Sequence, residues 1–286
     1  MENFVAFFED IPSSYRALIL ASGVLFFWIL EGIVPLFSTG YRRYRHAVVN
    51  AVFTLTTMVV NFALAFLIVT SADLATSLEF GVMHWIPGPM WLTVLLGVMV
   101  LDLISAWLIH LIQHKVAWMW KFHLVHHADT HVDVTTALRH HPGESVFRAL
   151  FTVLAVFVAG APIAVVFIYQ TASALFSQFN HANFRVPQSL DRALSLLIVT
   201  PDMHKVHHHF QQPLTDTNYG NIFSIWDRIF RTFAEVRDSR KIVYGLDTHM
   251  AESEHSNVRN LMTIPFQPYR RRPDPPPHEE QDILKQ

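Results

Sequence analysis

The sequence predicts an all-α integral membrane protein: a bundle of three spanning helices and a helical hairpin, with a histidine-rich helical cap on the cytoplasmic side. The first reason is composition, because 51% of the 286 residues are hydrophobic and only 15% are charged, against roughly 25% charged in soluble domains. The second is that several stretches are apolar over the about 20 residues that a spanning helix requires. The third is that many of the 18 histidines recur in short strings with helical spacing.

Composition also excludes several classes of function. The 21 Lys+Arg and 23 Asp+Glu residues give a formal net charge of -2, so the chain has no overall basic field and we expect no nucleic-acid partner. Cysteine is absent, which excludes disulfides, thiolate nucleophiles, cysteine-ligated zinc and cysteine-ligated iron–sulfur clusters. Histidine is therefore the most abundant side chain that could hold a transition metal.

Three apolar stretches are long enough to cross a bilayer. The first follows an acidic segment rather than a basic one, and no small-residue cleavage pattern comes after it. We therefore expect this stretch to remain in the mature protein instead of being removed as a signal peptide. The three predicted spanning helices are Ala17–Phe37, Val48–Val69 and Trp91–Ile112.

A fourth apolar region, Ala149–Phe184, contains no charged residue but is interrupted at Gly160, Ala161 and Pro162. Proline removes a helix hydrogen bond and clashes with the preceding turn. Each of the two arms is then too short for a comfortable crossing. The sequence therefore predicts a helical hairpin that enters and leaves the membrane on one side.

The positive charges predict the orientation in the membrane, because short cytoplasmic flanks collect Lys and Arg. Arg42, Arg43 and Arg45 lie in the first loop, whereas residues 46–114 contain no Lys or Arg. We expect an outside N-terminus, with everything after about Gln113 on the cytoplasmic side apart from the hairpin.

Three regions follow from this pattern. Residues 1–97 are predicted to form N-terminal membrane helices, and residues 98–235 a catalytic domain that includes the hairpin at 149–184. Residues 236–286 are predicted to be a C-terminal extension. Its last part, from about Pro265 and through the proline-rich run Pro273–Pro277, has the composition of a disordered tail.

The histidine strings contain the candidate metal-binding residues. HLIQH places two histidines four residues apart, and HLVHH and HKVHH each place three at i, i+3 and i+4, so the rings of each string share one helical face. Another histidine lies in FNHAN, at the end of the hairpin. Nine imidazoles are too many for one closed site, so two metals with open positions are the simplest interpretation. The nine are His110, His114, His123, His126, His127, His181, His204, His207 and His208.

A lone HxxxH pair is as often an ordinary polar helix end as a metal site. Two HxxHH strings favour metal binding more strongly, because six histidines on shared faces repel one another once protonated and are costly near a membrane. His141, in RHHPGE, is a candidate for a further ligand or for a residue that orients one. Arg139 and Glu144, on either side of it, are candidates for orienting ligands through hydrogen bonds. The acids Glu31 and Asp102, inside apolar spans, are interpreted as partners of neighbouring helices.

The ordered set of motifs resembles the fatty acid hydroxylase superfamily, also called the sterol desaturase family, of membrane-bound histidine-motif oxygenases. The resemblance covers roughly Val98–Phe233, through HLIQH, WKFHLVHHADTHVDVTTALRHHPGE, FNHAN, TPDMHKVHH and NYGNIFSIWDRIFRTF. It implies that the nine histidines hold two Fe ions at the cytoplasmic face and that the enzyme hydroxylates or desaturates a lipid with O2. Leu111, where Arg is common, and Arg231, where Gly is common, depart from the family pattern.

The sequence contains no GxGxxG motif and no P-loop, so a separate reductase or a ferredoxin-like electron donor is expected. Two other functions are alternatives. A zinc-dependent membrane hydrolase requires a general base such as the Glu of HExxH, and no such string occurs. A histidine-rich metal-handling membrane protein would carry ligands along several spanning helices, whereas these histidines cluster at one predicted surface.

Overall fold

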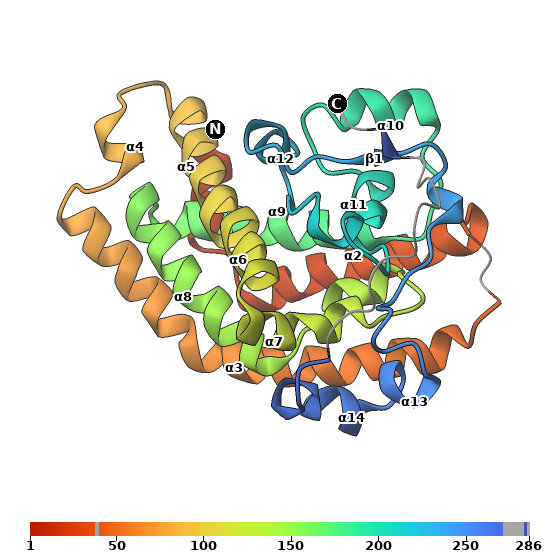
Figure 1. Cartoon of the computed structure of the whole chain (residues 1–286). Coiled ribbons are helices and arrows are strands. Elements are labelled where there is room, and N and C mark those ends of the chain that lie inside the picture. The colour runs from red at the N-terminus through yellow and green to blue at the C-terminus, as the bar shows by residue number, and fades with distance from the viewer. Residues whose placement is uncertain (38–39, 271–282, 285–286) are drawn as a thin grey trace.

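The computed structural model describes residues 1–37, 40–270 and 283–284, and these residues are almost entirely helical (Figure 1). Four of the described helices are long and apolar enough to cross a membrane, judged by length and composition. The helical class is thereby confirmed, and the four long apolar helices support a membrane bundle. These candidate spans are Ser13–Ile33, Arg43–Trp85, Met90–Lys115 and Pro142–Ala159.

The three predicted spans correspond to helices whose ends differ from the predicted ones. Helix α2 (Ser13–Ile33) overlaps the first but ends four residues before its predicted end, and α3 (Arg43–Ser77) contains the second. The third is a continuous helix made of α5 (Met90–Asp102), the π-helical segment η1 (Leu103–Leu108) and α6 (Ile109–Lys115). A π-helical turn is wider than an α-helical turn and is frequent at functional sites. Here it lies directly before the first histidine string.

The predicted hairpin region folds as α8 (Pro142–Ala159) and α9 (Ile163–His181). Its break lies at Gly160, whose φ is +69°, and a Cβ there would lie 2.4 Å from the carbonyl oxygen of Phe80. Only glycine fits such a left-handed helix end. Helix α8 begins before the uncharged stretch and is long enough to be a candidate span itself. The arms have 18 and 19 residues, so both are longer than expected, and α8 is a candidate span by length and composition.

The two arms diverge from their shared break. Helix α8 packs on α3 and η1, whereas α9 packs on α1 (Glu2–Glu9), α2 and α5. Their apolar side chains meet in a core that also contains Phe8, Ala72 and Leu101. Figure 1 shows α9 behind α5 and α6, and α8 beside α3. The start of α8 and the end of α9 are thus brought back toward the histidine strings.

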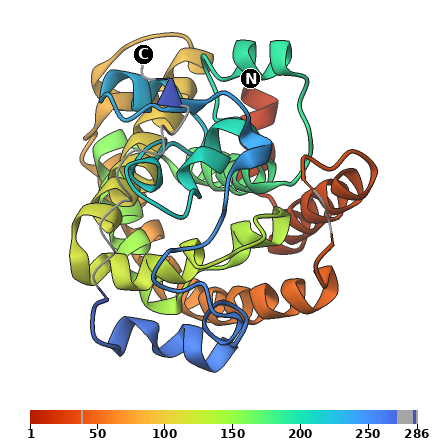
Figure 2. The ribbon, with the colours of Figure 1, turned by 45° about the vertical axis from the view of Figure 1, so that its right-hand side comes forward.

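Short elements build the cap, together with a two-stranded antiparallel sheet in which β1 (Glu235–Val236) pairs with β2 (Ile283–Leu284). In Figure 2, α13 and α14 lie beside α3. The remaining elements are α4 (Val82–Trp85), α7 (Ala117–His127), η2 (Val134–Leu138), α10 (Gln188–Leu194), α11 (Pro201–His207), η3 (Leu214–Asp216), α12 (Ile225–Ile229), η4 (Ser239–Lys241), α13 (Glu252–His255), α14 (Val258–Thr263) and η5 (Ile264–Phe266).

The C-terminal region packs on the rest of the chain as far as it is described. Leu261 and Ile264 are buried in one hydrophobic cluster with Phe53 of α3 and Val125 of α7. Of the tail expected to be disordered from about residue 265, residues 265–270 are described and begin within η5. Residues 271–282 and 285–286 of the predicted tail lie outside the described part.

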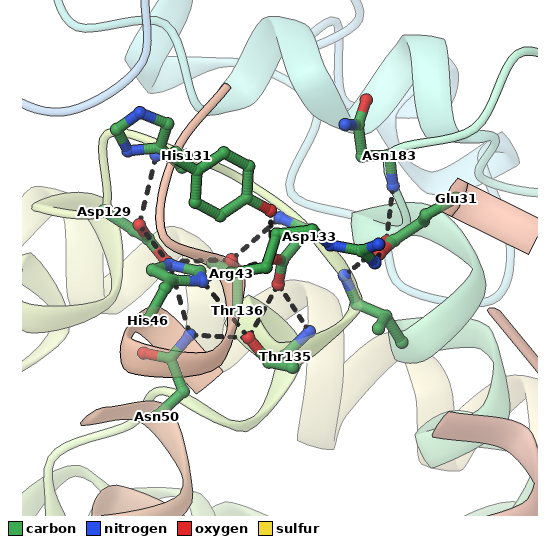
Figure 3. Close-up of polar contacts among 12 residues, drawn as sticks. Glu31, Arg43, His46, Asn50, Asp129, His131, Asp133, Thr135, Thr136 and Asn183 are labelled. Carbon is green, nitrogen blue, oxygen red and sulfur yellow. Dashed lines mark hydrogen bonds and ion pairs between the residues drawn. The ribbon is translucent and has the colours of Figure 1, made fainter. Parts of the chain in front are cut away.

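Glu31 joins the end of α2 to two segments of the cap (Figure 3). Its carboxylate accepts hydrogen bonds from the backbone N–H groups of Val134 and Asn183, both at 2.7 Å, and pairs with Arg43 at 2.9 Å. A buried charge is tolerated when it is paired and hydrogen-bonded in this way. The interpretation of Glu31 as a structural partner is confirmed.

Asp102 has the same role in the third span. It accepts hydrogen bonds from the backbone N–H groups of Ile222 at 3.3 Å and Phe223 at 3.2 Å, and from the indole N–H of Trp226 at 3.0 Å. These contacts connect α5 to α12 and the loop before it. The cap is therefore fixed directly onto the spans, close to where the histidine strings begin.

Candidate metal centre

The structure brings all nine predicted histidines together in two buried groups. Within each group, one nitrogen of every ring lies within 4.8 Å of one nitrogen of every other ring. The larger group consists of His110, His114, His123, His127 and His207, and the smaller group of His126, His181, His204 and His208. We refer to them below as the five-histidine and four-histidine groups.

The helices α7 and α11 each contribute to both groups. On α7, His123 and His127 belong to the five-histidine group and His126 to the four-histidine group. The spacing i, i+4 keeps His123 and His127 one above the other, while His126 is rotated toward the second group. The groups are in contact, since the rings of His127 and His208 stack with centroids 4.7 Å apart. They form one centre with two adjacent positions.

The spacing of the ring nitrogens fits ligands of a shared ion. His181 Nε2 lies 3.1 Å from His126 Nε2 and 3.0 Å from His204 Nε2. Two imidazole nitrogens bound at right angles, with metal–nitrogen bonds of about 2.0–2.1 Å, lie about 3.0 Å apart. Hydrogen bonding alone does not account for this contact. His181 Nδ1 lies 2.7 Å from the carbonyl oxygen of Ser177, to which it donates, so Nε2 has a single lone pair for two neighbours.

Other rings of the two groups are oriented through Nδ1 in the same way. When Nδ1–H donates to a carbonyl or carboxylate, the ring is fixed and Nε2 is left free to bind a metal. In four of the five rings of the five-histidine group, Nδ1 contacts the carbonyl oxygen of a cap residue or a carboxylate. The pairs are His110–Tyr219 O at 2.8 Å, His207–Thr217 O at 2.7 Å, His123–Glu144 Oε1 at 3.0 Å and His114–Asp216 Oδ1 at 3.2 Å.

Several buried ring nitrogens have no hydrogen-bond partner in the part of the chain that the structure describes. Both nitrogens of His127 and of His208 are in this position, as is Nε2 of His207. Burial, followed by the neighbouring histidines, lowers the pKa of these rings, that of His207 to about 3. Neutral imidazole offers a lone pair, and leaving it unsatisfied costs free energy. The residues present therefore fit metal ions in both groups.

Glu144, at the start of α8, orients two histidines at once. Its Oε1 accepts from His123 Nδ1 at 3.0 Å, from His140 Nδ1 at 3.1 Å and from Arg148 Nη1 at 3.2 Å. The ring of His140 in turn stacks on His126, with centroids 4.5 Å apart and an interplanar angle of 13°. Sequence reasoning suggested Glu144 as an orienting residue but missed His140, which lies outside the HxxHH spacing.

His141 lies outside both groups, so the structure does not bring this predicted ligand to the centre. Its Nδ1 accepts a hydrogen bond from the Gly143 N–H at 3.0 Å, and its Nε2 contacts the carbonyl oxygen of Met262 at 3.2 Å. The residue caps the N-terminus of α8, with Pro142 in the first helical position. Arg139 contacts no ligand ring either, because its guanidinium donates to the carbonyl oxygens of Val125 and His255.

Lys205 connects two of the ligand-bearing helices. It is completely buried, and its Nζ donates to the carbonyl oxygens of His181 at 2.8 Å and Ala182 at 3.0 Å. Burial lowers its pKa to about 8. A cation at a helix C-terminus is favourable because the last carbonyls carry partial negative charge. Lys205 thus holds the end of α9, and with it His181, against α11.

Replacing Glu144 with Gln should weaken metal binding about 10- to 100-fold, as is typical when a group that orients a ligand is lost. The amide keeps the shape of the side chain, but it loses the charge that holds His123, His140 and Arg148. Metal content during titration with a chelator measures the effect. Glu254→Gln, which removes a carboxylate that pairs with Arg270 outside both groups, is the control. An unchanged chelator midpoint in Glu144→Gln would contradict the orienting role.

Comparison with known proteins adds independent information. The family model for fatty acid hydroxylases matches residues 94–232. Alkylglycerol monooxygenase from Homo sapiens is 32% identical over 164 residues, which are 56% of this chain and 33% of that protein. Ornithine lipid hydroxylase OlsE from Rhizobium tropici is 24% identical over 239 residues, 80% of this chain and 70% of that protein. Cholesterol 25-hydroxylase from Rattus norvegicus is 24% identical over 54% of this chain and 51% of that protein.

The chain spans about a third of the length of the alkylglycerol monooxygenases it matches. No solved structure matches it. The matched region contains both histidine groups, Glu144 and the cap loop whose carbonyl oxygens orient the rings. Motif order, buried geometry and family match agree, and through residues 94–232 the chain belongs to the fatty acid hydroxylase superfamily.

Proposed function

We propose that the chain is a membrane-bound lipid hydroxylase whose nine histidines hold two Fe ions and which uses O2 and external electrons. The observation that carries the proposal is the pair of adjacent, buried, all-imidazole groups. The names of the relatives support hydroxylation over desaturation, because they are monooxygenases and hydroxylases of lipids. The lipid is an acyl, sterol, carotenoid or related chain, and the electrons come from a separate reductase or ferredoxin-like donor.

Iron suits these groups because bound iron can take part in reducing O2, which zinc cannot. The five-histidine group would hold one ion and the four-histidine group the other. The chain itself contributes orientation and exclusion of water. Carbonyl oxygens of the cap and the carboxylate of Glu144 keep the rings turned inward, and the cap covers the centre so that its histidines are buried.

The position of the centre suits a substrate that comes from the bilayer. His110 and His114 lie in the last turns of the third candidate span, and His181 is the last residue of α9. On α8, Val146, Leu150 and Leu154 form an exposed apolar stripe at spacing i, i+4 and i+8 that starts beside Glu144. A lipid chain lying along such apolar helices would reach the centre laterally. Its position there would decide which carbon is oxidised.

The geometry disfavours the two alternatives. A zinc hydrolase needs a carboxylate free to act as a general base. Among the described residues, the carboxylates of Glu144 and Asp216 contact rings of the five-histidine group, and each is engaged by an Nδ1, at 3.0 Å and 3.2 Å. A metal-handling protein would carry its ligands along several spans. Here the groups are gathered at helix ends under the cap. We further propose that the N-terminus is outside and that the centre faces the cytoplasm, as the positive charges indicate.

The proposed reaction is tested with the purified full-length chain, membrane lipid extract, a reductase system and isotopically labelled O2. We expect a lipid product that contains one labelled oxygen atom, detected by mass spectrometry, and no product without reductant or without O2. A product that lacks two hydrogens and carries no label would instead indicate desaturation. Full product formation under anaerobic conditions would overturn the proposal in favour of a hydrolase or isomerase.

A further inference from the structure

A cleft of about 770 Å³ opens on the side of α7 away from the metal centre. One of its lining residues, Val49 of α3, belongs to the hydrophobic cluster that includes Val125. Val125 lies on the face of α7 opposite the ligand histidines, since it is about half a helical turn from His123 and His127. The cleft is therefore separate from the proposed active site.

The wall contributed by α3 is basic. Arg45, His46 and Val49 line the cleft from one face of α3, and Arg42, the N-cap of the helix, lines it directly before them. Other residues of the same turns face outward, and the side chain of Tyr44 is 81% exposed. Since α3 belongs to a candidate span that begins at residue 43, the cleft lies at one end of that span. This is the level at which lipid headgroups meet a membrane protein.

The opposite wall comes from the loop after α7 and from the C-terminal region. It contributes His131, Arg139 and His255, together with Glu252, the only carboxylate among the described residues that line the cleft. Glu252 is 3.9 Å from Arg45, and both side chains are largely exposed. Arg139 is buried, and its guanidinium is hydrogen-bonded to the carbonyl oxygens of Val125 and His255. The exposed Arg42 and Arg45 therefore face one glutamate, which leaves a net positive charge.

Two further acids lie behind this wall but are already paired (Figure 3). The imidazole of His46 lies between them, with Nε2 2.8 Å from Asp129 and Nδ1 3.1 Å from Asp133. Asp133 also accepts a hydrogen bond from Tyr41, whose ring stacks on that of His131 with centroids 4.4 Å apart. These contacts join the start of α3 to the loop after α7, so they hold the two walls of the cleft together.

We propose that this cleft binds the phosphate headgroup of an anionic membrane lipid. Arginine is suited to phosphate because its planar guanidinium donates two parallel hydrogen bonds. The volume is within the range of about 300–1,000 Å³ that is typical of small-ligand sites. Basic residues beside a membrane span attract anionic lipids. The inference does not depend on the metal centre or on the proposed oxidation.

The test uses the purified full-length chain in nanodiscs of phosphatidylcholine with increasing fractions of phosphatidylglycerol, and native mass spectrometry to count retained lipids. We expect selective retention of phosphatidylglycerol. Retention should be about 30-fold weaker in the double variant Arg42→Gln/Arg45→Gln, because both charges adjoin the headgroup. Glu252→Gln should strengthen retention severalfold. Arg240→Gln/Arg259→Gln, which removes two charges from exposed residues that do not line the cleft, should leave it unchanged.

Inorganic phosphate in the same assay separates a lipid site from a phosphate site. We expect it not to displace the lipid at equal concentration, because it lacks the membrane anchor. Displacement at equal concentration, or equal retention of the two lipids, would overturn the proposal. It would also be overturned if Arg42→Gln/Arg45→Gln kept the wild-type selectivity. Should that double variant fail to fold, Arg45→Gln alone and Glu252→Gln must still shift retention in opposite directions.

Discussion

Replacing His126 or His207 with alanine is expected to remove one of the two metal ions and to reduce lipid oxidation at least about 100-fold. His126 belongs to the four-histidine group and His207 to the five-histidine group, so each variant should affect a different position of the centre. Loss of a ligand should be at least as damaging as loss of a residue that orients one, for which 10- to 100-fold effects are typical. Iron content and product formation measure the two effects.

His209→Ala is the matched control. It removes an imidazole directly beside His208, but His209 belongs to neither group, and its Nδ1 contacts the backbone of Gln211. We expect this variant to keep its iron and its activity. Thermal unfolding and membrane insertion of all three variants show whether the chain still folds. Unchanged iron in His126→Ala and His207→Ala would contradict the assignment of these residues as ligands.

The sequence predicts what depends on local pattern. The apolar spans are visible because their length and lack of charge are local properties, and the structure places helices at all of them. The nine histidines are visible because HxxxH and HxxHH are helical spacings. Their division into two groups is not visible. It depends on the rotation of α7 and α11 relative to α6 and α9, which only tertiary packing determines.

His141 shows how a local pattern misleads. Its position in RHHPGE, between two histidine strings, favoured a ligand, but a residue directly before Pro and a following apolar run is also the pattern of a helix N-cap. The N-cap pattern was visible in the sequence, and it is the one that describes His141 in the structure. The same N-cap explains why α8 begins before the uncharged stretch and reaches the length of a candidate span.

Long-range contacts account for the other differences. Lys205 stands inside HKVHH, where a charged residue is expected to be solvated, yet it is buried against the end of α9. His46 lies in none of the histidine strings, yet its ring lies between Asp129 and Asp133, more than 80 positions away in sequence. No spacing rule connects residues so far apart. Their partners follow from how α3 and α9 pack on the cap.

The metal centre also requires a particular membrane topology. His181 is the last residue of the α8–α9 region and shares a group with His126, which precedes that region. The chain must therefore return to the side of the membrane from which it left, however deeply α8 enters the bilayer. A single crossing by residues 142–181 would separate the two histidines by the thickness of the bilayer, about 30 Å.

Single introduced cysteines test this topology, because the native chain contains none. Ser77, Ala117 and Ser189 are exposed. Ser77 is the last residue of α3, Ala117 lies before the α8–α9 region and Ser189 lies after it. With a membrane-impermeant thiol reagent on intact cells, we expect labelling of Ser77→Cys only. After permeabilisation, all three should react.

The three positions separate two questions. Because His126 and His181 belong to the same four-histidine group, Ala117→Cys and Ser189→Cys must lie on the same side of the membrane. The reagent must therefore label both of them or neither, in either orientation of the protein. Labelling of only one of them from outside would contradict the returning region and with it the assembled centre. Labelling of both, without Ser77→Cys, would leave the hairpin intact and reverse the orientation. The metal centre would then face outward, away from the cytoplasmic electron donors that the proposed reaction needs, so that the oxidation and not the fold would have to be reconsidered.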